Sequence, residues 1–211
     1  MEQFYKLLRD YNKNFVKTHF DLPEWFFQYT ESNPPLYWKT IYQVLNDKNK
    51  NYSVVEIGAG FGDITALLNF MGYKNIVSYE RDSRLCNNIK DKIISLFGYR
   101  PKVINAAYPE KLNYTPDILL QVNCIYIDGI KNKEEFVKQI RTCYETNGVP
   151  KLYILEVIDD SYKADNDIFP KYIRLNRLDI RQLFPMREIT EYKTYIYPIN
   201  KVSKTLYCIC R

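Results

Sequence analysis

The strongest constraint on the fold is a short apolar run that passes through an acid into three closely spaced glycines. It reads Val-Val-Glu-Ile-Gly-Ala-Gly-Phe-Gly-Asp over residues 54–63. Residues 53–57 are predicted to form a buried strand, because they are largely β-branched and are followed at once by glycine. Residues 64–71 are predicted to form a helix, with Asp63 as its cap. Glycines in such a turn permit positive φ and a close approach to the backbone, so we expect a ligand to lie across it.

The glycine spacing indicates which ligand. A dinucleotide site has the spacing G-x-G-x-x-G and rests a pyrophosphate on the helix N-terminus. Here the glycines follow G-x-G-x-G, and the acid before them would repel a pyrophosphate and suit a cation. The segment resembles the E/D-x-G-x-G-x-G signature of class I S-adenosylmethionine (SAM)-dependent methyltransferases. This resemblance implies that the cofactor is SAM and that it is held by Glu56, Gly58, Ala59, Gly60 and Gly62.

Strands and helices alternate through the middle of the chain. A second strand is predicted over residues 76–80 and ends in Glu80, where an acid binds the ribose hydroxyls in doubly wound sheets. The further predicted elements are a helix over 83–97, strands over 102–106 and 122–127, a helix over 133–144 and a strand over 152–158. This alternation predicts an α/β fold with a parallel sheet, helices on both faces, and ligands at the carboxyl edge.

The C-terminal part departs from this alternation. A helix is predicted over residues 172–184, followed by strands over 186–197 and 203–210 with a loop at 198–201 that is short enough to make them antiparallel. We therefore predict a doubly wound, mostly parallel, Rossmann-like sheet of seven strands with a C-terminal antiparallel hairpin. This order resembles the class I methyltransferase domain over roughly residues 35–211.

Residues 1–50 are predicted to form an N-terminal helical lid on a single domain, and residues 51–211 the SAM-binding methyltransferase part. Apolar residues recur at helical spacing over 2–18 and 34–45. About fifty residues cannot bury a core of their own, so these helices should pack on the sheet. The resemblance implies that they cover the cofactor and shape the acceptor pocket.

Four further positions are assigned to the site. The resemblance places Arg81 beside the ribose acid, and Asn105 and Ala106 at the adenine, although Asn105 is equally typical of an ordinary strand-to-loop junction. Asp128, at the end of the predicted fourth strand, would face the transferable methyl as the catalytic residue. It could orient the acceptor, act as a base or bind a metal.

A metal is the less favoured of these roles. Residues 124–129 resemble the I-D-G segment of small-molecule and sugar O-methyltransferases, some of which hold a divalent ion between acids. The alternative metal set would be Asp128, Glu156, Asp159 and Asp160. The histidine that follows the segment in that family is missing, since Ile130 stands there, so we expect no metal.

Composition bounds the partners only loosely. A net charge of +5 over 211 residues permits an anionic partner without requiring one. Lys171, Arg174, Arg177 and Arg181 are predicted to form a basic stripe on one helix, either a solvated face or a grip for phosphate. Five cysteines without paired spacing are expected to be reduced, and the single histidine, His19, is expected to have a surface or capping role.

The chain is therefore predicted to be a SAM-dependent methyltransferase that O-methylates a small-molecule or sugar acceptor. The alternatives are an RNA or protein methyltransferase and a non-catalytic cofactor-binding protein. A nucleic-acid partner is possible but not favoured, and the oligomeric state is left open. The chain shows no signal peptide and no apolar stretch of membrane-spanning length, so we expect a cytoplasmic protein without a membrane partner.

Overall fold

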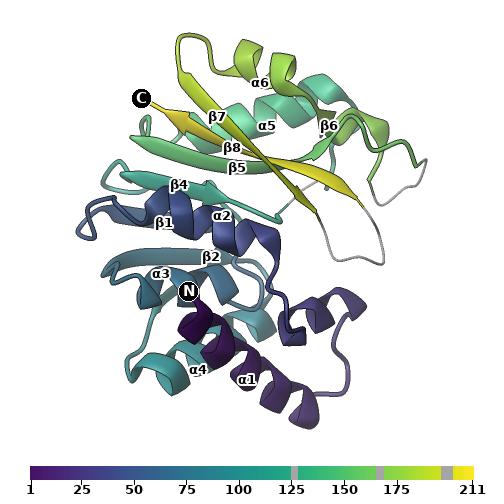
Figure 1. Cartoon of the computed structure of the whole chain (residues 1–211). Coiled ribbons are helices and arrows are strands. Elements are labelled where there is room, and N and C mark those ends of the chain that lie inside the picture. Colours follow the sequence, from purple (N-terminus) through teal and green to yellow (C-terminus); the bar gives the residue numbers. More distant parts are fainter. Residues whose placement is uncertain (125–127, 165–168, 196–201) are drawn as a thin grey trace.

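The chain folds around one eight-stranded sheet. The computed structural model describes residues 1–124, 128–164, 169–195 and 202–211. The strand order is β3-β2-β1-β4-β5-β8-β7, and the short β6 pairs with β5 (Figure 1). All pairs are parallel except β5 with β8 and β7 with β8. The strands are β1 Ser53–Ile57, β2 Asn75–Glu80, β3 Lys102–Asn105, β4 Ile118–Gln121, β5 Leu152–Asp159, β6 Arg174–Leu175, β7 Glu188–Tyr195 and β8 Ser203–Cys210. The predicted fold class is confirmed, with β6 as an additional strand.

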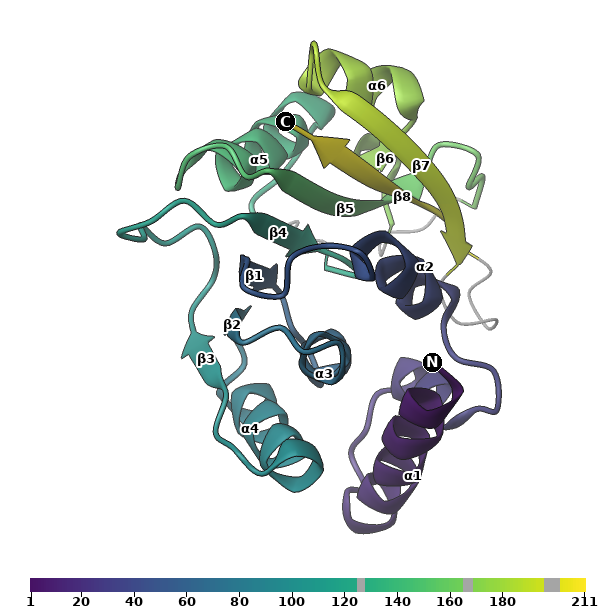
Figure 2. The same cartoon turned by 60° about the vertical axis from the view of Figure 1, so that its left-hand side comes forward.

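Helices cover both faces of the sheet. In Figure 2, α1 to α4 lie on one side of the sheet, and α5 and α6 lie on the other. Neighbouring β1 residues point to opposite faces, so that Val54 belongs to one hydrophobic core and Val55 to the other, both fully buried. The helices are α1 Glu2–Thr18, α2 Leu36–Leu45, α3 Asp63–Phe70, α4 Ser83–Phe97, α5 Lys133–Glu145 and α6 Arg177–Leu183, with 3-10 turns η1 Glu24–Thr30 and η2 Lys171–Ile173. This double coverage explains why the central strands β1, β4 and β5 are buried almost throughout.

The N-terminal helices pack on α3. Phe4 of α1 and Trp38 of α2 are buried in the same core as the α3 residues Ala66 and Leu67. The Phe4 ring centroid lies 5.0 Å from that of Phe70 at the end of α3. Figure 2 shows α3 between the sheet and α1. The two N-terminal helices α1 and α2 thus belong to the same hydrophobic core as α3.

The predicted helix over 172–184 is wrong in its first half. Residues 171–173 form a 3-10 turn, residues 174–175 form β6, and α6 begins only at Arg177. The reason is a capping box: the Asn176 side chain accepts hydrogen bonds from the backbone of Leu178 and Asp179, and the Asp179 carboxylate accepts one from the backbone of Asn176. Such a cap specifies the start of a helix at the following residue.

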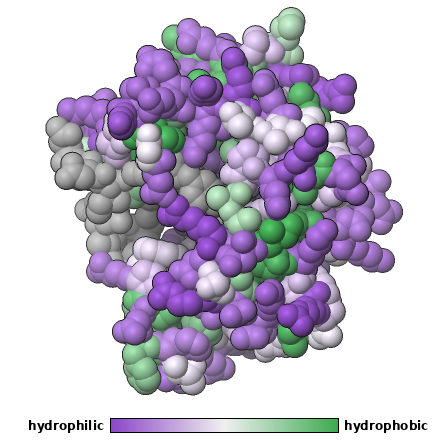
Figure 3. All heavy atoms as spheres, turned by 180° about the vertical axis from the view of Figure 1, so that it is seen from behind, coloured by the Kyte–Doolittle hydropathy of each residue, from purple (hydrophilic) through white to green (hydrophobic). Residues whose placement is uncertain are grey.

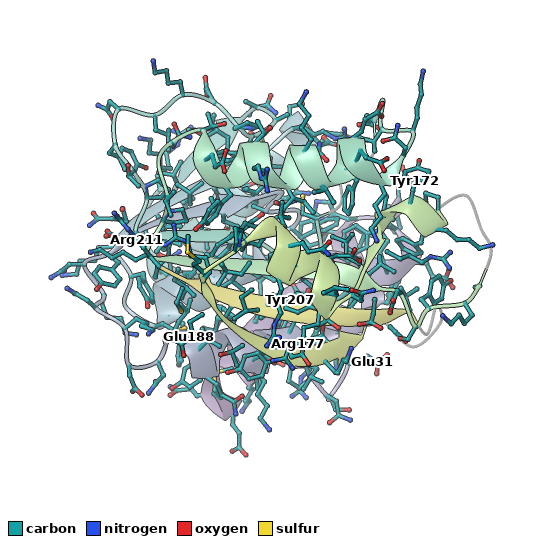
Figure 4. All side chains as sticks on the ribbon, turned by 90° about the horizontal axis from the view of Figure 1, so that it is seen from above. Glu31, Tyr172, Arg177, Glu188, Tyr207 and Arg211 are labelled. Atoms are coloured by element: carbon teal, nitrogen blue, oxygen red, sulfur yellow. The ribbon has the colours of Figure 1, made fainter. Side chains whose placement is uncertain are left out.

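The predicted basic stripe does not form. Arg174 is buried, and its guanidinium donates hydrogen bonds to the carbonyls of Tyr162, Ala164 and Phe169, which closes the loop after β5. Arg177 instead lies beside the hairpin (Figure 4), with its Nη1 3.6 Å from Glu191 Oε1. The cations at these positions therefore serve different parts of the fold.

The fourth strand lies earlier in the chain than predicted, and residues 122–124 of the predicted strand 122–127 are not in a strand. The strand is β4, which pairs with β1 and β5 and ends at Gln121. It starts at Ile118 because the preceding Asp117 carboxylate accepts hydrogen bonds from the backbone and hydroxyl of Ser53, which aligns β4 with β1. It stops because Asn123 adopts a φ of 53°. Residues 125–127 lie outside the described residues, as do residues 196–201, which include the end of the predicted strand 186–197 and the predicted loop 198–201.

Seen from behind, the surface is mostly hydrophilic, with small hydrophobic patches between polar side chains (Figure 3). Among the described residues, no helix has both the length and the apolarity that a membrane span requires.

Candidate cofactor site

The glycine turn connects β1 to α3 at the carboxyl edge of the sheet. Gly58, Gly60 and Gly62 have φ values of 66°, 56° and 77°, which side chains with a Cβ rarely adopt. A Cβ on Gly62 would also come within 3.0 Å of the Ile89 side chain of α4. Ala59, between them, is buried and donates its backbone N–H to the carbonyl of Tyr79 at 3.0 Å. The turn therefore needs glycine at these three positions, as the motif predicts.

Asp63 does not cap α3, so this prediction is wrong. Gly62 takes the N-cap position, and the buried Asp63 Oδ1 lies 2.7 Å from Lys92 Nζ of α4. The same oxygen accepts a hydrogen bond from Asn12 Nδ2 of α1 at 3.2 Å. Burial lowers the pKa of Lys92, while the charge of Asp63 opposes that shift. The acid thus joins α1, α3 and α4 behind the turn.

Glu56 lies beneath the turn and lines the crevice above it. Its Oε2 accepts hydrogen bonds from the hydroxyls of Thr65 at 2.5 Å and Ser78 at 3.1 Å. Burial raises the pKa of Glu56 to about 7, although both hydrogen bonds act in the opposite direction. A buried carboxylate with few compensating charges is suited to a cationic ligand group.

Glu80 connects the two loops that flank the site. Its two oxygens accept hydrogen bonds from the backbone N–H of Gly60 at 2.8 Å and of Asp82 at 2.9 Å. Asn105, at the end of β3, donates its side-chain amide to the carbonyls of Glu80 at 3.1 Å and Arg81 at 2.9 Å. Asn105 thus supports the loop after β2 and retains its Oδ1 for a ligand. Ala106 follows it and is half-buried.

Lid aromatics close the crevice over the glycine turn. Trp25, Tyr29 and Tyr37 line it from the lid, and Val122 and Asn123 line it from the segment after β4. The two tyrosine hydroxyls lie 3.1 Å apart. The remaining cavity has a volume of about 50 Å³, well below the roughly 300 Å³ at which ligand pockets begin. A cofactor can therefore enter only if these side chains move.

Asn123 is held by a buried ion pair between β5 and β8. Lys204 Nζ lies 2.9 Å from Glu156 Oε2, and both side chains are almost completely buried. Glu156 Oε2 also accepts the backbone N–H of Asn123 at 3.0 Å, and its Oε1 accepts the hydroxyl of Thr194 at 2.5 Å. Lys204 donates to Asn123 Oδ1 at 2.6 Å. Because an ammonium can only donate, the side-chain NH₂ of Asn123 must point away from Lys204.

That NH₂ group faces the lid. The pKa of Tyr29 is raised by burial, and hydrogen bonds with Tyr37 and Asn123 lower it in part. Asn123 and Tyr29 line the same crevice, one from the segment after β4 and the other from the N-terminal part.

Asp128 follows residues 125–127, which lie outside the described residues. It lies in an exposed turn, and its carboxylate contacts the guanidinium of Arg81, just after Glu80. The second residue beyond β4 is Asn123, which lines the crevice over the glycine turn. The catalytic role of Asp128 stays a prediction.

The alternative metal set is not brought together. Within the described residues no three His, Cys, Asp or Glu side chains gather in a way that could hold a metal. The carboxylates engage other partners: Glu156 with Lys204, Asp159 with Lys193 at 2.6 Å and Asp160 with Asn176 at 2.9 Å. Two of these partners are ammonium groups, which occupy the place that a cation would take.

The structure thus collects Glu56, the glycines and Glu80 at one site, with Asn105 as support. It adds the lid aromatics, Asn123 and Lys204, which sequence reasoning did not identify. A polar residue directly after the mostly apolar segment 118–122 was the available signal for Asn123. His19 ends α1, is exposed, and has its Nδ1 3.0 Å from the carbonyl of Phe15, in agreement with a capping role. All five cysteines are free.

Comparison with known proteins identifies the fold. No protein-family model and no curated protein sequence matches the chain. Solved structures do: magnesium protoporphyrin IX methyltransferase (ChlM) from Synechocystis PCC 6803 with bound SAM has a TM-score of 0.63 at 13% identity, covering 99% of this chain and 97% of that one. An O-methyltransferase from Bacillus cereus in complex with SAH has a TM-score of 0.57 at 13% identity, covering 99% and 91%. The methyltransferase domain of bacterial CtHen1 has a TM-score of 0.59 at 14% identity, covering 82% and 96%. The chain has the class I SAM-dependent methyltransferase fold.

Proposed function

We propose that this protein transfers a methyl group from SAM to an oxygen atom of a small-molecule acceptor. The fold, the glycine turn and the two buried acids support SAM as the methyl donor. Glu56 and the turn would hold the cofactor's amino acid end, because a buried carboxylate at a raised pKa gains most from an ammonium partner. Glu80 would accept the ribose hydroxyls. Arg81, Asn105 and Ala106 would flank the adenine.

The acceptor atom is inferred from the orientation of Asn123. Its Oδ1 is engaged by Lys204, so its NH₂ is what a bound acceptor would meet once Tyr29 has moved away. An NH₂ group donates, which suits an oxygen with free lone pairs. An amine acceptor would instead need an oxygen to receive its N–H. This orientation is the observation that carries the O-methylation proposal.

The described side chains that line the crevice favour an acceptor that is already deprotonated. Their two carboxylates, Glu56 and Asp63, lie beneath the turn, and Asp63 is paired with Lys92. His19 does not line this crevice. A carboxylate or an acidic hydroxyl needs no base, and the NH₂ of Asn123 would stabilise its charge and orient its lone pair. We propose such an oxygen, on a small molecule, as the acceptor.

The protein's contribution to the reaction is alignment and exclusion of water. When bound, SAM supplies an electrophilic methyl group on a sulfonium. An acceptor oxygen would take this methyl group by in-line displacement of SAH, so the chain's task would be to hold the two reactants in contact. Tyr29, Tyr37 and Trp25 would close over them after binding, and Asn123 would aim the oxygen.

The experiment follows tritiated methyl from SAM into pools of carboxylic acids, phenols, sugars and amines. We expect label in an oxygen-bearing pool, as a base-labile ester or a stable ether. Asn123→Asp replaces the donor NH₂ by an acceptor and should abolish transfer without changing the Kd for SAH. Asp128→Asn, made in parallel, should cost less turnover than Asn123→Asp. Label on an amine nitrogen, or full activity of Asn123→Asp, would overturn the oxygen assignment, and SAH binding would still test the cofactor assignment separately.

A further inference from the structure

A second hollow lies at the amino ends of β2 and β3, at the edge of the sheet opposite to the glycine turn. It has a volume of about 490 Å³, within the range of small-molecule pockets. β2 and β3 form one margin of the sheet (Figure 2), so the hollow is bounded by the loops that precede these strands and by part of the long connection between β3 and β4. Nothing in the proposed methyl transfer uses this region.

Three cations from three places converge on it. Lys74 precedes β2, Arg100 precedes β3, and Lys102 begins β3 opposite Val77 of β2. All three are exposed, and within the described part of the chain none of them makes an ion pair with a carboxylate. The lining side chains include no Asp or Glu. Elsewhere, by contrast, Lys92, Lys193 and Lys204 are each matched to an acid. A group of unmatched cations in a hollow is suited to a phosphate.

The remaining lining offers a surface for a planar group. Tyr99 at the end of α4 is 45% exposed, and Tyr114 lies in the connection between β3 and β4. Burial raises the pKa of both hydroxyls, so each stays protonated and can donate to a phosphate oxygen. Asn69 and Asn75 donate their side-chain NH₂ groups to the carbonyls of Thr65 and Asn51. Their Oδ1 atoms remain as acceptors for the N–H groups of a base.

We propose that this hollow binds a nucleoside phosphate, one nucleotide in size, either free or at the end of a single strand. Lys74, Arg100 and Lys102 would hold the phosphate, and Tyr99 would stack on the base. Stacking and cationic contacts of this kind are the common means of binding single nucleotides without reading their sequence. The site is independent of the methyl-transfer proposal.

The test titrates the full chain, saturated with SAH so that the cofactor crevice is filled. The probes are UDP, a phosphorylated uridine octamer and inorganic pyrophosphate. We expect UDP to bind and to weaken with added salt, as exposed charges require. Arg100→Gln and Lys74→Gln should each weaken it about tenfold, the size of one charged hydrogen bond. The matched control, Lys138→Gln at an exposed position of α5, should leave UDP binding unchanged.

Two comparisons test which ligand the hollow binds: a free nucleoside phosphate, the end of a single strand, or a phosphate group alone. Tyr99→Leu should weaken UDP about tenfold and leave pyrophosphate unchanged, because only the base stacks. An octamer that binds tighter than UDP, with the same sensitivity to Arg100→Gln, supports the site and identifies a nucleic-acid end as its source. Pyrophosphate binding as tightly as UDP would overturn the nucleoside assignment. If UDP does not bind, or if neither Arg100→Gln nor Lys74→Gln changes its binding, the proposed phosphate site is wrong.

Discussion

Replacing Glu80 should affect cofactor binding and folding to different extents in two variants. Its two oxygens accept the backbone N–H of Gly60 at 2.8 Å and of Asp82 at 2.9 Å, and in the proposed complex they also accept the ribose hydroxyls. Hydrogen bonds to a charged group contribute about 1.5–3 kcal/mol. Losing that much raises the Kd for SAH about 10- to 150-fold. The fold should weaken as well, since both N–H groups belong to the turns that flank the site.

Glutamine offers one acceptor oxygen where two backbone donors need partners, whereas alanine offers none. Both N–H groups are only partly buried, so each lost partner costs near the lower limit for such groups, about 1 kcal/mol. Glu80→Gln should therefore lower the free energy of unfolding by about 1 kcal/mol and Glu80→Ala by about 2 kcal/mol. Urea unfolding measures the stability, and calorimetric titration with SAH measures the affinity. Glu134→Gln, at an exposed position of α5, is the control. A Glu80→Gln variant that binds SAH as tightly as the wild type would refute the ribose assignment.

Three further expectations follow from the buried charges. The folded pKa of Glu56 is raised to about 7, so its stabilising contribution is complete below about pH 4.5 and is lost as the pH rises towards 7. Over that pH window, the urea midpoint of unfolding should fall more steeply in the wild type than in Glu56→Gln. Equal slopes would contradict the raised pKa. Lys204→Met leaves Glu156 buried and uncompensated and should cost about 3–5 kcal/mol of stability, much of which should be recovered by adding Glu156→Leu. A Lys204→Met variant as stable as the wild type would mean that the pair is not buried in solution. Methyl transfer should survive EDTA, because lysines already neutralise Glu156 and Asp159, and loss of activity that Mg²⁺ restores would return these acids to a metal site.

The parts of the fold that depend on local pattern were predictable. β1, α4 and β8 each combine an unambiguous periodicity with clear end signals, and the glycine turn needs no long-range information, because positive φ at three alternate residues excludes other side chains. The mostly parallel sheet with an antiparallel C-terminal pair followed from the alternation of elements and the short predicted loop between the last two strands.

The errors arose where two adjacent segments competed. Residues 118–122 and 124–127 are both short and mostly apolar, and it is the pairing of β4 with β1 and β5, aligned by Asp117 and Ser53, that makes the first a central strand. That choice places Asn123, two residues after β4, in the lining of the crevice. Likewise, cation spacing over 171–181 fits a helix, but burial of Arg174 under the loop after β5 prevents one. Long-range partners of this kind leave no local pattern.

The lid aromatics could not be selected from a chain with 20 tyrosines and 11 phenylalanines. Tyr29 and Tyr37 differ from the others only in their position over the glycine turn. The fixed orientation of Asn123 depends equally on a lysine from the last strand. Both features come from segments that only the folded chain brings together.

The most direct measurement of the central claim is a calorimetric titration of the wild-type protein with SAH and, separately, with NAD⁺. Glu56 beneath the turn should favour the ammonium of SAH and disfavour a pyrophosphate. We predict saturable binding of SAH at one site per chain, weakened about tenfold or more in Glu80→Gln, and no detectable binding of NAD⁺. Tighter binding of NAD⁺ than of SAH would contradict the assignment of this crevice to SAM.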